Sequence, residues 1–219
     1  MAKAILFDVD GTLIDSNDLH AAAWREAFLH FGADVPFEAV RSQIGKGGDN
    51  LIPALLPPDL VERKQQEIEE YRSTLFQRDY MPRAVAFPGV RELVERLKTD
   101  GKTVILASSA KGAELSFNLQ VAGIEDLIDG TTSKDDVEHS KPCPDIFEAA
   151  LQKAGVTAEE AVVVGDSPFD IQAAVKLGIA AVGVRSGGFP DEVLEEAGTV
   201  AIYDGPEDLL RNYESSPLA

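Results

Sequence analysis

Short apolar runs, most of them ending at a polar residue, constrain the fold of this chain more than any other feature. Such runs lie at residues 4–7, 103–107, 161–164 and 180–184. Continuous apolar runs of this length are typical of strands that are buried on both faces of a parallel sheet. Segments with helical spacing separate the later runs, and an alternation of strands and helices implies crossover connections. The sequence therefore predicts an α/β protein with a doubly wound, parallel, Rossmann-like sheet.

An all-helical segment interrupts this pattern after the first run. Residues 17–31 have apolar side chains four apart, and Ser16 or Asn17 is suited to be the N-cap of a helix there. Residues 36–80 also have helical spacing, and none of them has a strand pattern. We therefore predict a helical cap at 15–87, inserted into a core made of 1–14 and 88–219. The tail at 215–219 is expected to fray.

Composition excludes several classes of function. Asp and Glu number 38 against 20 Lys and Arg, which gives a net charge of −18. Such a charge argues against binding of nucleic-acid phosphates, which needs a basic face. No apolar run approaches the roughly 18 residues of a membrane span, and Asp8 interrupts the N-terminal run before a signal peptide could form. The single cysteine, Cys143, is compatible with a reducing compartment. We expect a cytoplasmic protein with no nucleic-acid or membrane partner, and the oligomeric state stays open.

Polar residues follow the predicted strands where a ligand site is expected. Asp8, Ser108 and Asp166 each come directly after an apolar run or one residue beyond it. Ligands of open parallel sheets bind outside the carboxyl ends of the strands. Lys141 precedes a helix expected at 144–154 and could bring a cation to the same edge. Each residue alone also fits an ordinary turn, but several strand ends with complementary chemistry together predict a ligand site at this edge.

These residues resemble the motifs of the haloacid dehalogenase superfamily, whose most common members are phosphatases. The segment Asp8-Val9-Asp10-Gly11-Thr12 is similar to the first motif. Ser108 and Lys141 match the second and third motifs, and residues 165–170 match the acidic fourth. The helical insert lies where the small helical cap of this family lies, and the resemblance covers nearly the whole chain. It implies a Mg²⁺-dependent phosphatase of a small phosphorylated metabolite, such as a sugar phosphate or a phosphoglycolate-like compound.

The resemblance also implies roles for the acidic residues. Asp8 would be the nucleophile that forms an aspartyl-phosphate, and Asp10 would be the general acid and then the general base. The Mg²⁺ ligands would be Asp8, the backbone carbonyl of Asp10, and Asp166, an oxygen-only set that suits this ion. Asp170 would lie in the metal site or hold a water on the metal. It also fits a helix-start carboxylate that is favoured by the helix dipole.

The second and third motifs would hold the transferred phosphoryl group. The hydroxyl of Ser108 and the backbone N–H groups of Ser109 and Ala110 can meet phosphate oxygens at the start of a helix. Lys141 would supply a compensating positive charge. A Ser-Ser-Ala turn by itself favours ordinary helix capping, and only the full set of motifs in order reverses this interpretation.

Two features of the insert are candidate substrate contacts. His20 and Trp24 lie four residues apart and so share a helix face. This pair resembles the cap entrance of beta-phosphoglucomutases and related sugar phosphatases, although packing inside the cap also explains it. Lys46, which lies between glycines, is a second candidate, and a simple turn is the alternative.

Two other functions on the same fold remain open. The resemblance to beta-phosphoglucomutase extends over seven positions: Asp8, Asp10, His20, Trp24, Ser108, Lys111 and Lys141. It fails at Gly165, where the mutase has an acidic residue, and at 46–49, which lacks the mutase arginine that grips a second phosphate. Hydrolysis is therefore favoured over transfer. Haloacid dehalogenation is disfavoured because those enzymes lack the counterpart of Asp10 and the metal. The other alternative is a non-catalytic phosphate-binding protein.

Overall fold

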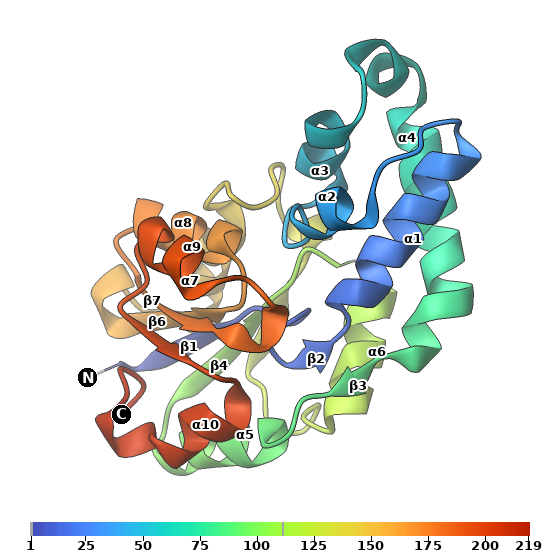
Figure 1. The fold of residues 1–219 in the computed structure, drawn as a ribbon. Helices are drawn as coiled ribbons and strands as arrows, with labels where there is room; N and C mark the ends of the chain where they lie inside the picture. Colours follow the sequence, from blue (N-terminus) through green and yellow to red (C-terminus); the bar gives the residue numbers. More distant parts are fainter. Residues whose placement is uncertain (1, 111) are drawn as a thin grey trace.

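The central sheet of the protein is parallel and doubly wound. The architecture comes from a computed structural model that describes residues 2–110 and 112–219. Among these residues, six strands pair in parallel in the order β5-β4-β1-β6-β7-β8 (Figure 1). Their bounds are β1 Ala4–Phe7, β4 Thr103–Ala107, β5 Gly130–Thr132, β6 Ala161–Gly165, β7 Ala180–Val184 and β8 Ala201–Tyr203. From β1 the chain proceeds to β4 and β5 on one side and then returns to β6, β7 and β8 on the other. The predicted fold class is confirmed.

Both faces of the sheet are covered by helices. Along β1, Ile5 and Phe7 point into one apolar cluster and Ala4 and Leu6 into another, as the two-residue period of a strand requires. The helices of the core are α5 Val90–Thr99, α6 Gly112–Ala122, α7 Asp145–Ala154, α8 Pro168–Lys176, α9 Asp191–Ala197 and α10 Pro206–Arg211. Residues of α5, α6 and α10 join the first cluster, and residues of α7, α8 and α9 join the second. Burial on both faces explains the continuous apolar runs.

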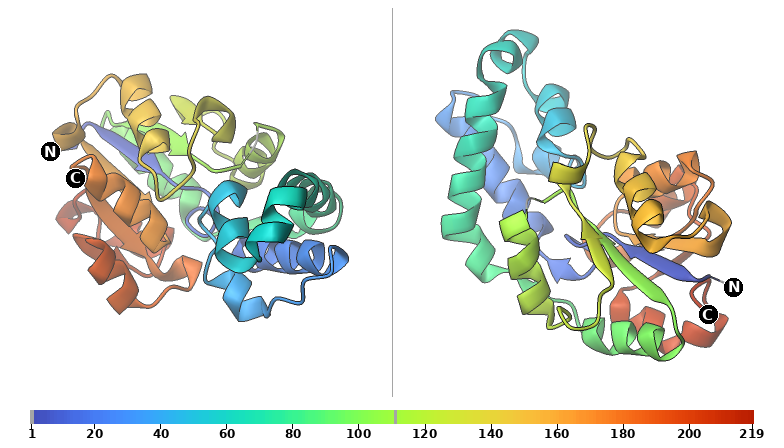
Figure 2. Two further views of the ribbon diagram at one scale, coloured as in Figure 1. Left: turned by 90° about the horizontal axis from the view of Figure 1, so that it is seen from above. Right: turned by 180° about the vertical axis from the view of Figure 1, so that it is seen from behind.

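A helical unit follows the first strand and stands beside the core (Figures 1 and 2). It consists of α1 Asn17–His30, α2 Phe37–Arg41, α3 Gly48–Leu55 and α4 Pro58–Leu75. The unit has an apolar cluster of its own, in which Trp24, Phe28 and Ile52 are buried. Two short strands, β2 Ile14–Asp15 and β3 Val85–Ala86, pair antiparallel where the chain enters and leaves the unit. The predicted boundaries, after residues 14 and 87, fall within or close to this ribbon.

Two strands were missed, and one local prediction was wrong. The strands β5 and β8 were not predicted, because they lie at the edges of the sheet and are too short and too little buried to form an apolar run. The tail does not fray, since Leu218 is fully buried in the first cluster. The predicted N-cap of α1 at Ser16 is confirmed, although its hydroxyl donates to Asp10 and not to the helix. For the two strands and the tail, partners far away in the chain decide the local structure.

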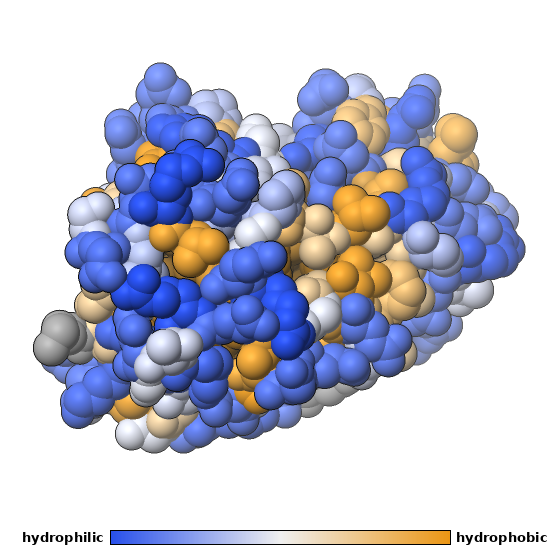
Figure 3. Space-filling model, turned by 90° about the horizontal axis from the view of Figure 1, so that it is seen from below, coloured by the Kyte–Doolittle hydropathy of each residue, from blue (hydrophilic) through white to orange (hydrophobic). Residues whose placement is uncertain are grey.

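The face of the molecule that is seen from below is mainly hydrophilic. Figure 3 shows the face at the bottom of Figure 1, where polar side chains dominate and apolar ones lie in small groups. Of the apolar side chains described, Val85 and Val200 are among the most exposed, at 57% and 58%. In the described part of the chain, no helix combines the length and the apolar character needed to cross a bilayer.

Candidate active site at the carboxyl ends of the strands

Three of the predicted residues meet because their strands are neighbours in the sheet. Asp8 follows β1, Ser108 follows β4 and Asp166 follows β6, and β1 pairs with both of the other strands. Their exposed fractions are 5%, 0% and 1%. The chain also reverses its winding direction at β1, and such a switch point is where open α/β sheets hold their ligands.

Lys141 joins these residues from the loop that precedes α7. Its ammonium group lies 2.5 Å from Asp8 Oδ1 and 2.7 Å from Asp170 Oδ1, and it donates to the carbonyl of Ala107 at 3.1 Å. The side chain is 1% exposed. Burial alone would lower the pKa of Lys141, but Asp170 and Asp8 raise it above its ordinary value. Lys141 is therefore a fixed positive charge beside the candidate nucleophile.

Asp170 has a structural role as well as a place in the site. It is the third residue of α8, and its Oδ2 accepts from the backbone N–H of Ser167 at 3.1 Å and from its hydroxyl at 2.6 Å. The other oxygen, Oδ1, faces Lys141. The sequence left open whether this residue caps a helix or serves the site, and one side chain with two oxygens is in a position to do both.

Asp166 is held by residues at the start of the chain. Thr12 Oγ1 donates to Asp166 Oδ1 at 3.2 Å, and Asn17 Nδ2 donates to Oδ2 at 2.8 Å. Two glycines press against the same carboxylate. A Cβ atom at Gly11 would lie 2.4 Å from Asp166 Oδ2, and one at Gly187 only 1.8 Å from it. Larger residues at these positions would displace the carboxylate.

A divalent cation fits the three buried carboxylates. Ligand atoms of Asp8, Asp166 and Asp170 lie within 4.8 Å of one another. Burial, followed by the charge of Asp170, raises the pKa of Asp8 well above its ordinary value. The same two causes raise the pKa of Asp166 to about 7. Lys141 balances only one of these charges, so a small oxygen-binding dication would relieve the remaining repulsion.

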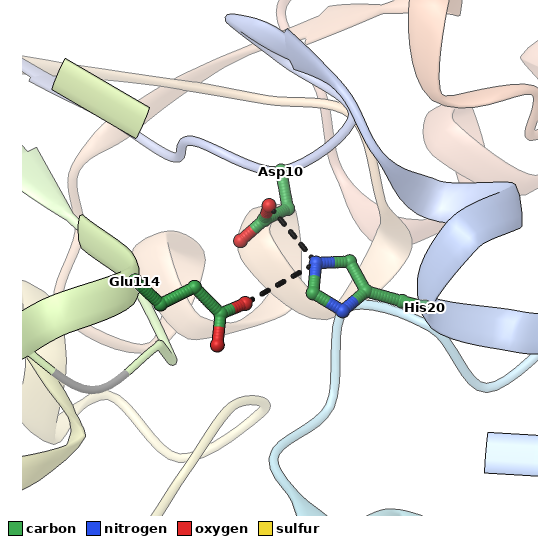
Figure 4. A group of neighbouring side chains, drawn as sticks. All are labelled: Asp10, His20 and Glu114. Carbon is green, nitrogen blue, oxygen red and sulfur yellow. Dashed lines mark hydrogen bonds and ion pairs between the residues drawn. The ribbon is translucent and has the colours of Figure 1, made fainter. Parts of the chain in front are cut away.

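Asp10 faces the helical unit and belongs to a second cluster. Figure 4 shows that one ring nitrogen of His20, on α1, faces both Asp10 and Glu114, which lies on α6. His20 Nε2 lies 3.0 Å from Asp10 Oδ1 and 3.5 Å from Glu114 Oε1, and Ser16 donates to Asp10 Oδ1 at 2.6 Å. Burial alone would raise the pKa of Asp10, but His20 and the hydroxyl of Ser16 lower it to about 2. Asp10 is thus ionised before any ligand binds.

Arg72 of α4 orients His20 from the other side. Its guanidinium group hydrogen-bonds His20 Nδ1. An arginine is always a donor, so Nδ1 accepts and Nε2 carries the proton that is donated to Asp10. The imidazole ring also stacks on Phe76, with ring centroids 4.1 Å apart. His20 is therefore held in one tautomer and one orientation.

The remaining predicted residues surround a cavity between the helical unit and the core. Among its lining residues are Trp24, Lys46, Ser109 and Ala110, together with Asp8, Asp10, His20, Arg72 and Glu114. The N–H group of Ala110 donates to Ser108 Oγ at 3.0 Å. Trp24 also packs in the apolar cluster of the helical unit, so packing and cavity lining coexist. Lys111 lies outside the described residues.

Sequence reasoning missed Arg72, Glu114, Asn17 and Asn118 as site residues. Glu114 and Asn118 had a detectable signal: they are polar, lie four apart on α6, and are 5% and 3% exposed on its buried side. Asn118 donates to Asp10 at 3.4 Å. Arg72 had no signal, because α4 is rich in charged residues and only packing distinguishes this one from its neighbours.

The chain is similar in sequence to known proteins over most of its length. A family profile described as haloacid dehalogenase-like hydrolase matches residues 5–184. Probable phosphatase IndB of Dickeya dadantii is 30% identical, over 100% of this chain and 99% of its own. The phosphorylated carbohydrates phosphatase of Thermotoga maritima is 30% identical, over 95% and 96%. The chain also matches SUPPRESSOR OF QUENCHING 1 of Arabidopsis thaliana at 32% identity, but it spans only 19% of that protein.

Solved structures have the same fold. A hydrolase from Pseudomonas syringae superimposes with a TM-score of 0.89 at 29% identity, over 98% of this chain and 99% of that one. A Bacteroides vulgatus protein described provisionally as a beta-phosphoglucomutase has a TM-score of 0.86 at 26% identity, over 98% and 88%. Both similarities extend through the core and the helical unit.

Proposed function

The chain belongs to the haloacid dehalogenase-like hydrolases, and from this premise we propose that it is a Mg²⁺-dependent phosphatase. The substrate is a small phosphorylated metabolite, and the reaction proceeds through an aspartyl-phosphate on Asp8. One observation carries the proposal. A buried ammonium group, that of Lys141, contacts Asp8, the candidate nucleophile, which belongs to a cluster of three carboxylates. Asp8 also lines a cavity that reaches the helical unit.

The first half-reaction follows from the arrangement of these groups. An oxygen of Asp8 attacks phosphorus in line with the leaving oxygen, and the bond to the alcohol breaks. Lys141 and the hydroxyl of Ser108 neutralise charge on the phosphoryl oxygens, together with the N–H groups of Ser109 and Ala110. Asp10 protonates the departing alcohol. The bound phosphate anion favours protonation of Asp10, because a nearby negative charge raises a carboxyl pKa.

The second half-reaction uses the same residues in reverse. Asp10, now ionised, accepts a proton from water, and the water oxygen attacks phosphorus. The bond to Asp8 breaks, and the carboxylate and inorganic phosphate are regenerated. Mg²⁺, held by Asp8, Asp166 and the backbone carbonyl of Asp10 with Asp170 beside them, would supply the positive charge that makes attack by an anion on an anion possible.

Turnover with purified protein tests the proposal. Inorganic phosphate release would be measured for sugar phosphates, phosphoglycolate and nucleoside monophosphates, with Mg²⁺ and with a chelator. We expect release from at least one class with Mg²⁺ and none with the chelator. A protein that binds phosphate but releases none from any substrate would instead be the non-catalytic alternative.

A phosphomutase is the second candidate, because Arg72 brings a cap arginine to the cavity from α4 although residues 46–49 contain none. Gly165 weighs against it. A Cβ atom there would lie 2.5 Å from the Cβ of Asp170, so the acidic residue of the mutases does not fit without movement. The enzyme would be incubated with β-glucose 1-phosphate and a trace of the 1,6-bisphosphate. Phosphate accumulating faster than glucose 6-phosphate supports hydrolysis, and the reverse order supports transfer.

A further inference from the structure

The carboxylate of Asp166 packs against the loop at residues 185–188, which follows β7. The loop approaches it most closely at Gly187, where a Cβ atom would lie 1.8 Å from Asp166 Oδ2. The hydroxyl of Ser186 donates to the carbonyl of Gly11 at 2.8 Å, which ties the same loop to the turn after β1. Because folded interiors are close-packed, the position of this loop limits the positions that the Asp166 carboxylate can take.

Two side chains of the helical unit donate to the carbonyl oxygen of Gly187. Asn17, the first residue of α1, donates through Nδ2 at 3.3 Å. Arg41, the last residue of α2, donates through its guanidinium group. The other side of that guanidinium donates to Asp18 Oδ1 at 2.7 Å, and the Arg41 side chain is only 17% exposed. Two helices of the helical unit therefore hold one loop of the core.

Asn17 also contacts the carboxylate of Asp166 directly. Its Nδ2 donates to Asp166 Oδ2 at 2.8 Å, and the residue is 4% exposed. A side-chain amide nitrogen carries two hydrogens, so it can serve the carboxylate and the carbonyl of Gly187 together. Groups that hydrogen-bond a metal ligand fix its orientation, and their removal typically weakens metal binding. The chemical steps proposed above give neither Asn17 nor Arg41 a role.

We propose that Asn17 and Arg41 are positioning residues for the Mg²⁺ site. Asn17 orients the carboxylate of Asp166, and Arg41 holds the loop against which this carboxylate packs. The inference rests on the proposed function, which places Asp166 among the Mg²⁺ ligands. It goes further, because it makes the affinity for the ion depend on the contact between the helical unit and the core. Since such coupling is reciprocal, Mg²⁺ binding would in turn strengthen that contact.

The first test measures Mg²⁺ binding without substrate, by titration calorimetry. Asn17→Ala removes both hydrogen bonds, and the Kd for Mg²⁺ should rise at least about fivefold. Arg41→Ala acts only through the loop, so we expect a smaller rise, of about twofold or more. Thermal unfolding of the metal-free variants shows whether each one is folded. If Asn17→Ala does not fold, Arg41→Ala, at a partly exposed position, still tests the inference.

The second test separates positioning of the ion from a general loss of structure. Hydrolysis of p-nitrophenyl phosphate would be followed at increasing Mg²⁺ concentrations. In Asn17→Ala the concentration for half-maximal activity should rise in step with the Kd. At saturating Mg²⁺ its kcat should return to within about twofold of that of the wild type, because the ion then restores the site. A variant with a merely damaged fold would keep a low kcat at every Mg²⁺ concentration.

Matched controls remove the same side chains from the surface. Asn212 is exposed, and its amide donates to Asp208 Oδ1 at 3.0 Å, within the C-terminal segment. Arg63 is 67% exposed and pairs with Asp59 on the same helix. Asn212→Ala and Arg63→Ala should bind Mg²⁺ with the Kd of the wild type.

The outcomes distinguish this inference from the proposed function. If the wild type binds Mg²⁺ but cleaves no phosphate ester, the proposed function fails, and the Kd values alone decide the inference. If the folded Asn17→Ala and Arg41→Ala variants bind Mg²⁺ as tightly as the wild type, the inference is overturned whatever the turnover. A wild type that binds no Mg²⁺ would contradict both.

Discussion

At the scale of single residues, the site depends on glycines that leave room for its carboxylates as well as on the carboxylates themselves. Gly187 and Gly11 leave room for Asp166, and Gly165 leaves room for Asp170. The positive φ of Gly11, 77°, adds a backbone reason at that position. Gly187 has no such reason, so only the close approach of Asp166 requires a glycine there.

Gly187→Ala should therefore impair the site without disrupting the fold. Its Cβ atom would lie 1.8 Å from Asp166 Oδ2 and would displace the carboxylate from its present position. We expect kcat to fall at least tenfold and the Mg²⁺ concentration for half-maximal activity to rise. Gly205→Ala is the control, since the nearest atom to its Cβ is 3.7 Å away. Equal activity of the two variants would contradict the proposed place of Asp166 in the metal site.

Asp8→Asn should affect turnover and thermal stability differently. Turnover should fall below detection, because an amide does not attack phosphorus effectively. The melting temperature should not fall at neutral pH, because a raised pKa means that the surroundings of Asp8 disfavour its charge. Activity assays and thermal unfolding test the two halves. Activity near that of the wild type would remove Asp8 from its assigned role.

At the scale of elements, helix α3 connects the helical unit to the loop that carries Lys141. Asp49, at the start of α3, pairs with Lys134 at 2.6 Å and accepts from the N–H of Ser140 at 3.2 Å. Asn50 donates to the carbonyl of Ser140 at 3.0 Å. Because Ser140 precedes Lys141 in the chain, these contacts couple the position of the helical unit to that of the lysine.

Asp49→Ala should weaken this coupling. The pair is partly exposed, so we expect a loss of about 1 kcal/mol, or roughly fivefold in kcat/KM. Asp59→Ala on α4 removes a carboxylate whose side chain is 74% exposed and pairs only locally with Arg63. Steady-state kinetics of the two variants distinguish the cases: a similar loss in both would mean that surface charge, and not the contact with the Ser140 loop, is responsible.

The C-terminal segment is a structural element and not a loose end. Leu218 is fully buried, and its N–H donates to Ser216 Oγ at 3.2 Å. We expect Leu218→Ala to lower the free energy of unfolding by about 2 kcal/mol, as large-to-small changes in a core do. Leu29→Ala, at a side chain 56% exposed, should change it by less than about 0.5 kcal/mol. Denaturant titration measures both free energies of unfolding. If Leu218→Ala destabilises the protein no more than Leu29→Ala does, the tail is frayed and not packed.

At the scale of the whole molecule, metal binding and folding are linked through the buried acids. The pKa of Asp166 is about 7 in the folded, metal-free protein and near 4 for an ordinary Asp. A pKa raised by folding gives stability that is complete below the unfolded value and is lost as the pH rises through the folded one. The metal-free protein should therefore become less stable between about pH 4 and 7.

Mg²⁺ should reverse this loss. The increase in melting temperature on adding Mg²⁺ should be larger at pH 8 than at pH 5.5, because protons compete with the ion for Asp166 and Asp8. Asp166→Asn should reduce the pH dependence of the increase, because Asp8 then remains as the buried acid for which protons compete, whereas a general effect of the net charge of −18 would persist. The measurement is thermal unfolding at two pH values, with and without Mg²⁺. An equal increase in melting temperature at both pH values would contradict the proposed linkage between protonation and Mg²⁺ binding.

The sequence by itself determined the class of the fold and the residues at the ends of its central strands. A strand buried on both faces must be apolar throughout, so β1, β4, β6 and β7 could be predicted from the sequence as apolar runs. The polar residues at or just beyond the ends of β1, β4 and β6 were visible with them. The motif order then predicted Asp8, Asp10, Ser108, Lys141 and Asp166 as a set. The experiments described above test the proposed roles of these residues.

Only the tertiary structure decided which other residues reach the site and line the cavity. Edge strands are too short to form a pattern, and the buried Leu218 owes its burial to residues far away in the chain. Arg72 is one charged residue among many on α4 until packing brings it against His20. Glu114 and Asn118 are polar residues on a helix until its neighbours bury them. The contribution of a charged side chain to binding depends on its partners and on its burial, and both are properties of the folded chain.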